Sequence, residues 1–228
     1  MTPKAVLFDV DFTLVKPGPL LGPEGYRDAG RRHGLELDPG LYAEARAAAI
    51  VDLHHHPELE HDEEIWIRFT EDIVRGMGGE GESCRAVAVA ITERWLYSEN
   101  FELYDDVLPV LGLLREHRLK LGLVSNTSRD LDVFVRHFRL DVDAWISSRT
   151  HGKVKPSPTI FSAILERLGV EPRAAVMVGD SAEDDIAGAR ALGMEAYLVD
   201  REGRTRAVDA LPTLLALPAL LGIGADAA

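Results

Sequence analysis

From about residue 101 to residue 200, short apolar runs typical of strands alternate with segments of helical periodicity. The strand-like runs are LKLGLVS, AWISS, AAVMVGD and EAYLV, and the helical segments are RDLDVFVRHF, SPTIFSAILERLG and AEDDIAGARALG. Such alternation predicts βαβ units that form one parallel sheet with helices on both faces. The run Ala5 to Phe8 is typical of a further strand, buried on both faces of the same sheet. We therefore expect an α/β fold.

The region from about 17 to 100 has a different pattern, rich in Ala, Arg, Glu and Leu at helical spacing. In DPGLYAEARAAAIVDL, for example, Asp38 is a suitable N-cap and Pro39 suits the first helical position. PGPLLGPEG precedes the region, and YDDVLP, which we expect to be a turn, follows it. We expect roughly four helices inserted into the sheet domain. The core domain would then comprise 1–16 and 101–228, and the helical domain 17–100.

The composition limits the partners. A net charge of −13 over 228 residues disfavours nucleic acid and anionic membranes. No stretch approaches the ~20 apolar residues that span a bilayer, and the N-terminus predicts a strand rather than a signal peptide. We expect a soluble, cytoplasmic protein. The helical block could supply a homodimer surface, but packing within the block explains its apolar stripes equally well.

Polar residues follow four strands of the predicted sheet at their carboxyl ends, where open parallel sheets bind ligands. They are Asp9 and Asp11 after the first strand, Ser125 and Asn126 after the second, Lys153 and Lys155 after the third, and Asp180, Asp184 and Asp185 after the fourth. Carboxylates held close together repel unless a cation lies beside them. Asp9, Asp11 and Asp180 can share a divalent cation, with a lysine opposite. Oxygen ligands without His or Cys indicate a hard cation such as Mg²⁺, which also binds substrate phosphates.

Four segments resemble the motifs of the haloacid dehalogenase-like (HAD) hydrolase superfamily, and they occur in the same order. They are DVDFTL (9–14), SN (125–126), KP (155–156) and GDSAEDD (179–185). The resemblance implies a Rossmann-like core with an inserted helical cap. The opening of the helical block, GPEGYRDAGRRHGLELDP, is similar to that of phosphoglycolate-phosphatase-like and REG-2-like members. The implied activity is magnesium-dependent hydrolysis of a small phosphomonoester.

The resemblance also implies a role for each motif residue. Asp9 would be the nucleophile that forms an aspartyl-phosphate, and Asp11 the general acid and base, with its backbone carbonyl on the metal. Ser125 and the Asn126 backbone N–H would hold phosphate oxygens. Lys155 would neutralise the nucleophile and the phosphate. Asp9 and Asp180 would be direct ligands of Mg²⁺, and Asp185 would bind it through water or orient Lys155.

Three details depart from these assignments or stay open. Asp184 occupies a position often filled by Asn in the family, so the choice between Asp184 and Asp185 is open. Phe12 stands where many members have Gly, and we expect it to narrow the site or touch the cap. The run 54–56 consists of three histidines, which we interpret as an exposed stretch between cap helices rather than a metal site.

The same fold could also serve functions other than a phosphatase. A 2-haloacid dehalogenase uses the same attacking Asp, but it needs neither a metal nor an acid at Asp11. A phosphonatase needs a cap lysine, and none occurs between Lys16 and Lys120. A phosphomutase would use the same groups as a phosphatase and return the phosphate to a second hydroxyl. A non-catalytic binding module is the alternative from outside the enzymes. The particular phosphorylated metabolite does not follow from the sequence.

Overall fold

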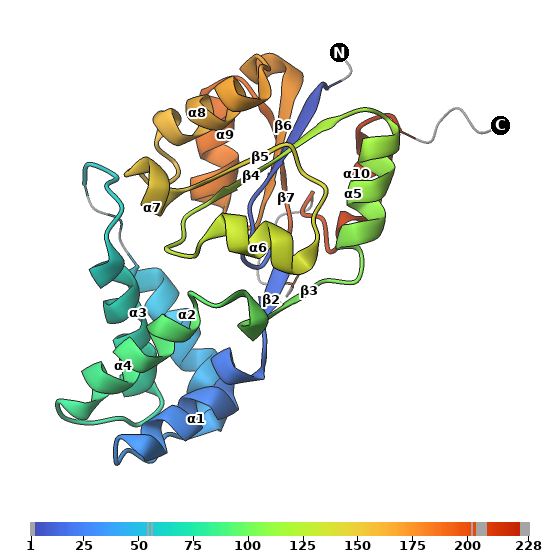
Figure 1. Ribbon diagram of the computed structural model, residues 1–228. Helices are drawn as coiled ribbons and strands as arrows, with labels where there is room; N and C mark the ends of the chain where they lie inside the picture. Colours follow the sequence, from blue (N-terminus) through green and yellow to red (C-terminus); the bar gives the residue numbers. More distant parts are fainter. Residues whose placement is uncertain (1–2, 54, 56, 202, 204–208, 224–228) are drawn as a thin grey trace. The chain divides into compact units, whose positions relative to one another are not determined.

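The computed structural model describes residues 3–53, 55, 57–201, 203 and 209–223. Contacts within the chain define two compact units, shown in Figure 1. Met1–Lys16 and Leu103–Ala228 form the first unit, and Pro17–Glu102 forms the second. The chain passes between them at β2 (Val15–Pro17) and β3 (Phe101–Leu103), which pair as a two-stranded sheet. His54 and His56 of the histidine run lie outside the described residues.

A parallel sheet of five strands, in the order β5-β4-β1-β6-β7, forms the centre of the first unit. The strands are β1 (Ala5–Phe8), β4 (Lys120–Ser125), β5 (Ala144–Ser147), β6 (Ala175–Gly179) and β7 (Glu195–Leu198). β1 lies in the middle, paired with β4 and β6, and all four of its residues are buried. This position explains why β1 is apolar on both faces. The predicted α/β fold with a parallel sheet is confirmed.

Helices cover both faces of this sheet, and Figure 1 shows α8 and α9 on the opposite side from α5 and α10. The helices are α5 (Val107–Glu116), α6 (Leu131–Phe138), α7 (Ser148–His151), α8 (Pro158–Leu168), α9 (Gly188–Ala191) and α10 (Leu217–Leu220). Short 3₁₀ turns occur at η4 (Pro172–Ala174) and η6 (Leu214–Ala216), and η5 (Ala182–Ala187) is π-helical.

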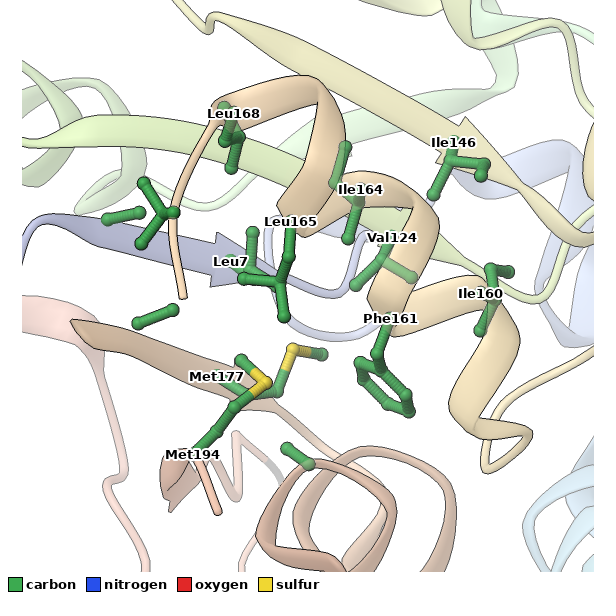
Figure 2. Packing of buried hydrophobic residues seen from close by; sticks show 14 of the residues in the cluster. Leu7, Val124, Ile146, Ile160, Phe161, Ile164, Leu165, Leu168, Met177 and Met194 are labelled. Atoms are coloured by element: carbon green, nitrogen blue, oxygen red, sulfur yellow. The ribbon is translucent and has the colours of Figure 1, made fainter. Parts of the chain in front are cut away.

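One apolar cluster fills the space between α8 and the sheet (Figure 2). Figure 2 shows Leu165 and Phe161 of α8 in one cluster with Leu7 of β1 and Met177 of β6. Gly122 of β4 lies close to this cluster. A Cβ at Gly122 would lie 2.7 Å from a methyl carbon of Leu7 and 3.0 Å from one of Leu168. A glycine at this position therefore leaves room for the side chains of Leu7 and Leu168.

Two segments differ from the sequence expectations. The predicted turn YDDVLP is wrong in its second half, where α5 begins at Val107. Pro109 lies in the first turn of α5, where a missing N–H costs nothing. The helix predicted over AEDDIAGARALG begins instead as the π-turn η5. The backbone N–H groups of Asp185 and Ile186 both donate to the Ser181 carbonyl, at 3.1 and 3.2 Å, and such widened turns occur frequently at functional sites.

The second unit is helical in its described part. Its elements are η1 (Pro19–Leu21), α1 (Pro23–Arg32), η2 (Pro39–Leu41), α2 (Tyr42–Asp52), α3 (Glu63–Gly76), α4 (Ser83–Arg94) and η3 (Ser98–Asn100). Asp38 caps η2 by accepting the Gly40 N–H at 2.8 Å, so the predicted cap is correct, although the chain enters a 3₁₀ turn before α2. Ile73, Val74 and Ile91 belong to the unit's own buried cluster. Within the described residues, none of the helices has the length and apolar character needed to span a bilayer.

The packing of α8 predicts a stability difference between two leucines of the first unit. Leu165 is buried against the sheet, whereas Leu108 on α5 is 52% exposed. We expect Leu165→Ala to lower the free energy of unfolding by about 2–5 kcal/mol, because it leaves a cavity in a packed core. Leu108→Ala should change it by less than about 1 kcal/mol. Denaturant unfolding measures both values, and equal losses would contradict this assignment of the core.

Candidate active site

The parallel register places the ends of β1, β4 and β6 at one edge of the sheet. Phe8 lies beside Leu123 of β4 and Val178 of β6, so the residues that follow emerge together. The Asp9 backbone N–H continues the ladder by donating to the Val178 carbonyl at 2.9 Å. The side chain of Asp9 therefore projects from the end of a strand that is fixed on both sides. The sequence prediction that polar groups gather at this edge rests on the same geometry.

The Lys155 ammonium connects two of these carboxylates. Its Nζ lies 2.5 Å from Oδ1 of Asp9 and 2.6 Å from Oδ1 of Asp185, and all three side chains are buried. Asp185 also accepts the Ser181 backbone N–H at 3.0 Å through Oδ2. Both oxygens of Asp185 are thus bonded to protein groups. This contact fits the second of the two expectations for Asp185, the orientation of Lys155.

Burial and mutual attraction shift the pKa values of this trio. Burial has the largest effect on Asp9 and raises the pKa of that carboxyl, against the opposing charge of Lys155. Burial likewise raises the pKa of Asp185. For Lys155, burial disfavours the charged form, but the charges of Asp185 and Asp9 outweigh it and raise the pKa of the ammonium above its usual range. Lys155 is therefore a permanent positive charge beside the Asp9 carboxylate.

Asn126 fixes the backbone that carries Lys155. Its Oδ1 accepts the Lys155 backbone N–H at 2.7 Å, and its Nδ2 donates to the Lys155 carbonyl at 3.0 Å. Nδ2 also lies 3.3 Å from Oδ2 of Asp184. The two adjacent acids therefore have different partners, since Asp185 contacts Lys155 and Asp184 contacts Asn126. The side chain of Asn126 is a support for Lys155, whereas the expected phosphate contact concerns its backbone N–H.

Ser125 is the last residue of β4 and is 1% exposed. Within the part of the chain that the structure describes, its hydroxyl makes no hydrogen bond to another residue. Ser125 lies at the same strand end as Asn126. A hydroxyl at this position can donate to a ligand without first breaking an internal bond.

Gly179 allows Asp185 to approach the end of β6. A Cβ at Gly179 would lie 2.2 Å from Oδ2 of Asp185, which is far inside van der Waals contact. Any side chain at this position would displace the carboxylate that holds Lys155. The glycine of the GDS segment is thus required by close approach of a functional group, not by an unusual backbone angle.

Arg129 is a site residue that the sequence analysis missed. Its Nη2 donates to Oδ1 of Asp11 at 2.9 Å, although the two residues lie 118 positions apart. The Asp11 carboxylate is not in the group of carboxylates that lie close enough to share an ion. The metal contact expected of Asp11 is through its backbone carbonyl, and that contact stays a prediction. The available signal was a basic residue three positions after Asn126, in a loop at the functional edge of the sheet. The pairing itself was not deducible, because only the fold brings this loop beside the end of β1.

The oxygen donors of the site fit a divalent cation. Asp9, Asp180 and Asp185 each offer a carboxylate oxygen, and these atoms lie within 4.8 Å of one another. Among these carboxylates and Lys155, negative charges outnumber the positive charge by two. An all-oxygen donor set suits Mg²⁺ rather than a softer metal. The predicted ligands Asp9, Asp180 and Asp185 are therefore close enough to act on one ion.

A model of haloacid dehalogenase-like hydrolases matches residues 3–193 of the chain. This protein belongs to the haloacid dehalogenase-like hydrolase family. It is 33% identical over 210 residues to glyceraldehyde 3-phosphate phosphatase of Methanopyrus kandleri, an alignment that covers 87% of this chain and 84% of that protein. The solved HAD phosphatase of Thermococcus onnurineus has 30% identity and a TM-score of 0.64, and the match covers 96% of this chain and 98% of that one. The solved 2-haloacid dehalogenase of Pseudomonas syringae has 26% identity and a TM-score of 0.61, with the same coverage.

Phe12 of this HAD-like hydrolase has a left-handed backbone, with φ of 62°. Such a conformation costs a non-glycine residue roughly 1–2 kcal/mol and is natural for Gly. The turn is closed by the Phe12 N–H, which donates to the Val15 carbonyl at 2.7 Å. The glycine expected here on family grounds would therefore relieve strain.

The carboxylate group predicts a binding effect that is independent of turnover. We expect Mg²⁺ to raise the melting temperature of the wild type, because an ion that binds the native state stabilises it by about 2.7 kcal/mol at 100 times its dissociation constant. Asp180→Asn should reduce this shift. The matched control is Glu183→Gln, which removes one charge from an exposed residue three positions away. Thermal unfolding across a magnesium titration measures the shifts, and equal shifts in the two variants would contradict the ligand assignment.

Proposed function

We propose that this HAD-like hydrolase is a magnesium-dependent phosphatase that hydrolyses a small phosphomonoester through an aspartyl-phosphate. The observation that carries the proposal is the Asp9 carboxylate, held at a strand end 2.5 Å from the Lys155 ammonium and grouped with Asp180 and Asp185. A nucleophile that attacks a phosphate dianion needs such neutralisation of charge on both partners. The phosphatase among the relatives at 33% identity supports the same reaction class.

In the first step, an oxygen of Asp9 attacks phosphorus while the bond from phosphorus to the ester oxygen breaks. The leaving oxygen takes a proton from the carboxyl of Asp11, two residues further along the chain. The products of this step are an aspartyl-phosphate at Asp9 and a free alcohol. Lys155 is already bonded to Asp9, so its charge stays beside the phosphoryl group as the group transfers.

In the second step, water attacks the phosphorus of the aspartyl-phosphate and the bond to Asp9 breaks. Asp11, now a carboxylate, takes a proton from the attacking water and returns to its starting form. Phosphate is released and both aspartates are regenerated. During both steps the Ser125 hydroxyl and the Asn126 backbone N–H would donate to phosphoryl oxygens, because both lie at the end of β4.

Asp9, Asp180 and the Asp11 backbone carbonyl would hold the magnesium ion, and Asp185 would bind it through water or orient Lys155. When bound, the ion supplies neutralisation of the negative charge on phosphoryl oxygens. The site fits this requirement because its donors are oxygen atoms and its own charge balance is negative.

Dehalogenase activity is the principal alternative hypothesis, since a solved 2-haloacid dehalogenase shares the fold at 26% identity. Displacement of a halide from carbon needs no proton for the leaving group and no cation for a phosphate. The carboxylate trio and the acid at Asp11 favour phosphoryl transfer. A phosphomutase would use the same first step, and it differs only in whether a second hydroxyl replaces water.

The unit Pro17–Glu102 is proposed to act as the cap that determines substrate choice. We also propose that Phe12 contributes to that choice, because its aromatic side chain follows the acid Asp11 directly. Small phosphorylated metabolites are the expected substrate class. The net charge of −13 disfavours large polyanions.

The first test measures phosphate release from para-nitrophenyl phosphate and from a panel of phosphometabolites, with magnesium and with chelator. We expect magnesium-dependent release by the wild type and a loss of roughly 1,000-fold or more in Asp9→Asn, because the nucleophile is removed. Circular dichroism checks that the variant is folded. Substantial activity of folded Asp9→Asn, or release of halide but not phosphate, would overturn the proposal.

A second test concerns Phe12. We expect Phe12→Gly to change the ranking of substrates in the panel while the turn persists, because Gly adopts the left-handed backbone without strain. The matched control is Arg118→Gly, which replaces another left-handed residue, with φ of 59°, just before the amino end of β4. Arg118→Gly should leave the ranking unchanged. A uniform change of kcat/KM across the panel in Phe12→Gly would remove the proposed role of this side chain.

A further inference from the structure

Arg129 is a buried cation outside the four family motifs. It lies in the loop between β4 and α6, and its side chain is fully buried. Its backbone N–H donates to the Thr127 hydroxyl oxygen at 3.1 Å, and its guanidinium carbon lies 5.5 Å from the centre of the Phe134 ring. Backbone and guanidinium are therefore both held by neighbours within the first unit.

The guanidinium contacts one oxygen of Asp11. Nη2 lies 2.9 Å from Oδ1, and the Asp11 side chain is 20% exposed. Among the residues that the structure describes, Oδ2 of Asp11 accepts no hydrogen bond. The contact therefore fixes the carboxyl group through one oxygen and leaves the second oxygen available to a reacting group.

A buried arginine is a costly way to stabilise a fold, because desolvation offsets the attraction within the pair. A second buried arginine pair, among the residues that the structure describes, has contacts typical of a structural role. Arg201 contacts Asp106 at 2.6 Å and the Thr13 carbonyl at 2.7 Å, and so ties separate segments together. Arg129 also joins distant segments, but its partner Asp11 is a partly exposed carboxylate two residues after the proposed nucleophile.

We propose that Arg129 is a positioning residue that orients the Asp11 carboxyl for its proton transfers. The inference rests on the proposed phosphatase function. It follows that loss of Arg129 affects the steps in which Asp11 moves a proton and spares a step that needs none. The first step needs the acid only when the leaving oxygen is basic, whereas hydrolysis of the aspartyl-phosphate always needs the base.

Two substrates of similar shape separate these steps. Phenyl phosphate has a basic leaving oxygen, whereas para-nitrophenyl phosphate releases a stable phenolate without protonation. For Arg129→Gln we expect kcat/KM to fall about 10- to 100-fold with phenyl phosphate, and no more than about 3-fold with para-nitrophenyl phosphate. With the latter, kcat should also fall, and a burst of phenolate should precede slow turnover, because the aspartyl-phosphate accumulates.

Arg115→Gln is the matched control. Arg115 forms ion pairs with Asp141 and Asp143 at 3.0 and 2.6 Å, and none of these residues belongs to the site. This variant should keep the wild-type ratio of the two kcat/KM values and show no new burst. Arg129→Lys retains the charge with a single-point donor, and its ratio should fall between wild type and Arg129→Gln. It also serves as the test variant if Arg129→Gln does not fold.

Each outcome supports or overturns the inference. A selective loss with phenyl phosphate, a burst with para-nitrophenyl phosphate and partial rescue by Lys support it. If kcat/KM falls by the same factor with both substrates in a folded variant, the inference is overturned and the phosphatase proposal stays intact. No magnesium-dependent release from either substrate by the wild type counts against the phosphatase itself, and the inference about Arg129 falls with it.

Discussion

The buried ammonium of Lys155, between Asp9 and Asp185, is the interaction on which the site depends. Removing two carboxylates from water costs several kcal/mol each unless a partner compensates them. Lys155 supplies that compensation at 2.5 and 2.6 Å. It also connects three segments that are far apart in the chain: the end of β1, the loop before α8 and the π-turn after β6. The charge of Lys155 thus stabilises the local fold, and it is also the charge that the proposed phosphoryl transfer requires.

The residues around Lys155 form hydrogen bonds that hold Lys155 and Asp185 in position. The Asn126 side chain forms hydrogen bonds with both the backbone N–H and the backbone carbonyl of Lys155. The Ser181 N–H donates a hydrogen bond to the second oxygen of Asp185. Gly179 removes the side chain that would push Asp185 away. Small displacements of a reacting group cost large factors in rate, so these supports are part of the proposed mechanism.

Among the described residues of the first unit, the arginine pairs Arg201–Asp106 and Arg129–Asp11 differ in the exposure of the acid. Arg201 and Asp106 join the loop after β1 to the start of α5 and to η6, where Asp106 accepts the Leu214 N–H at 2.6 Å. This pair fixes the scaffold behind the site. The Arg129 pair instead ends at a carboxylate that solvent can reach. The proposed role of Arg129 rests on this exposure of the acidic partner rather than on burial of the arginine.

The sequence by itself determined the parallel sheet, the helical insertion and the ordered acids, lysine and hydroxyl at the strand ends. It could do so because strand periodicity and the residues after each strand are local in the chain, and parallel topology then places all of them at one edge. It did not reveal α5, the π-turn at η5 or the contact of Arg129 with Asp11. These involve a proline tolerated in the first turn of a helix, two backbone N–H groups that share the Ser181 carbonyl, and a pairing across 118 positions. Only tertiary structure decides them, because contact between distant side chains leaves no periodicity in the sequence.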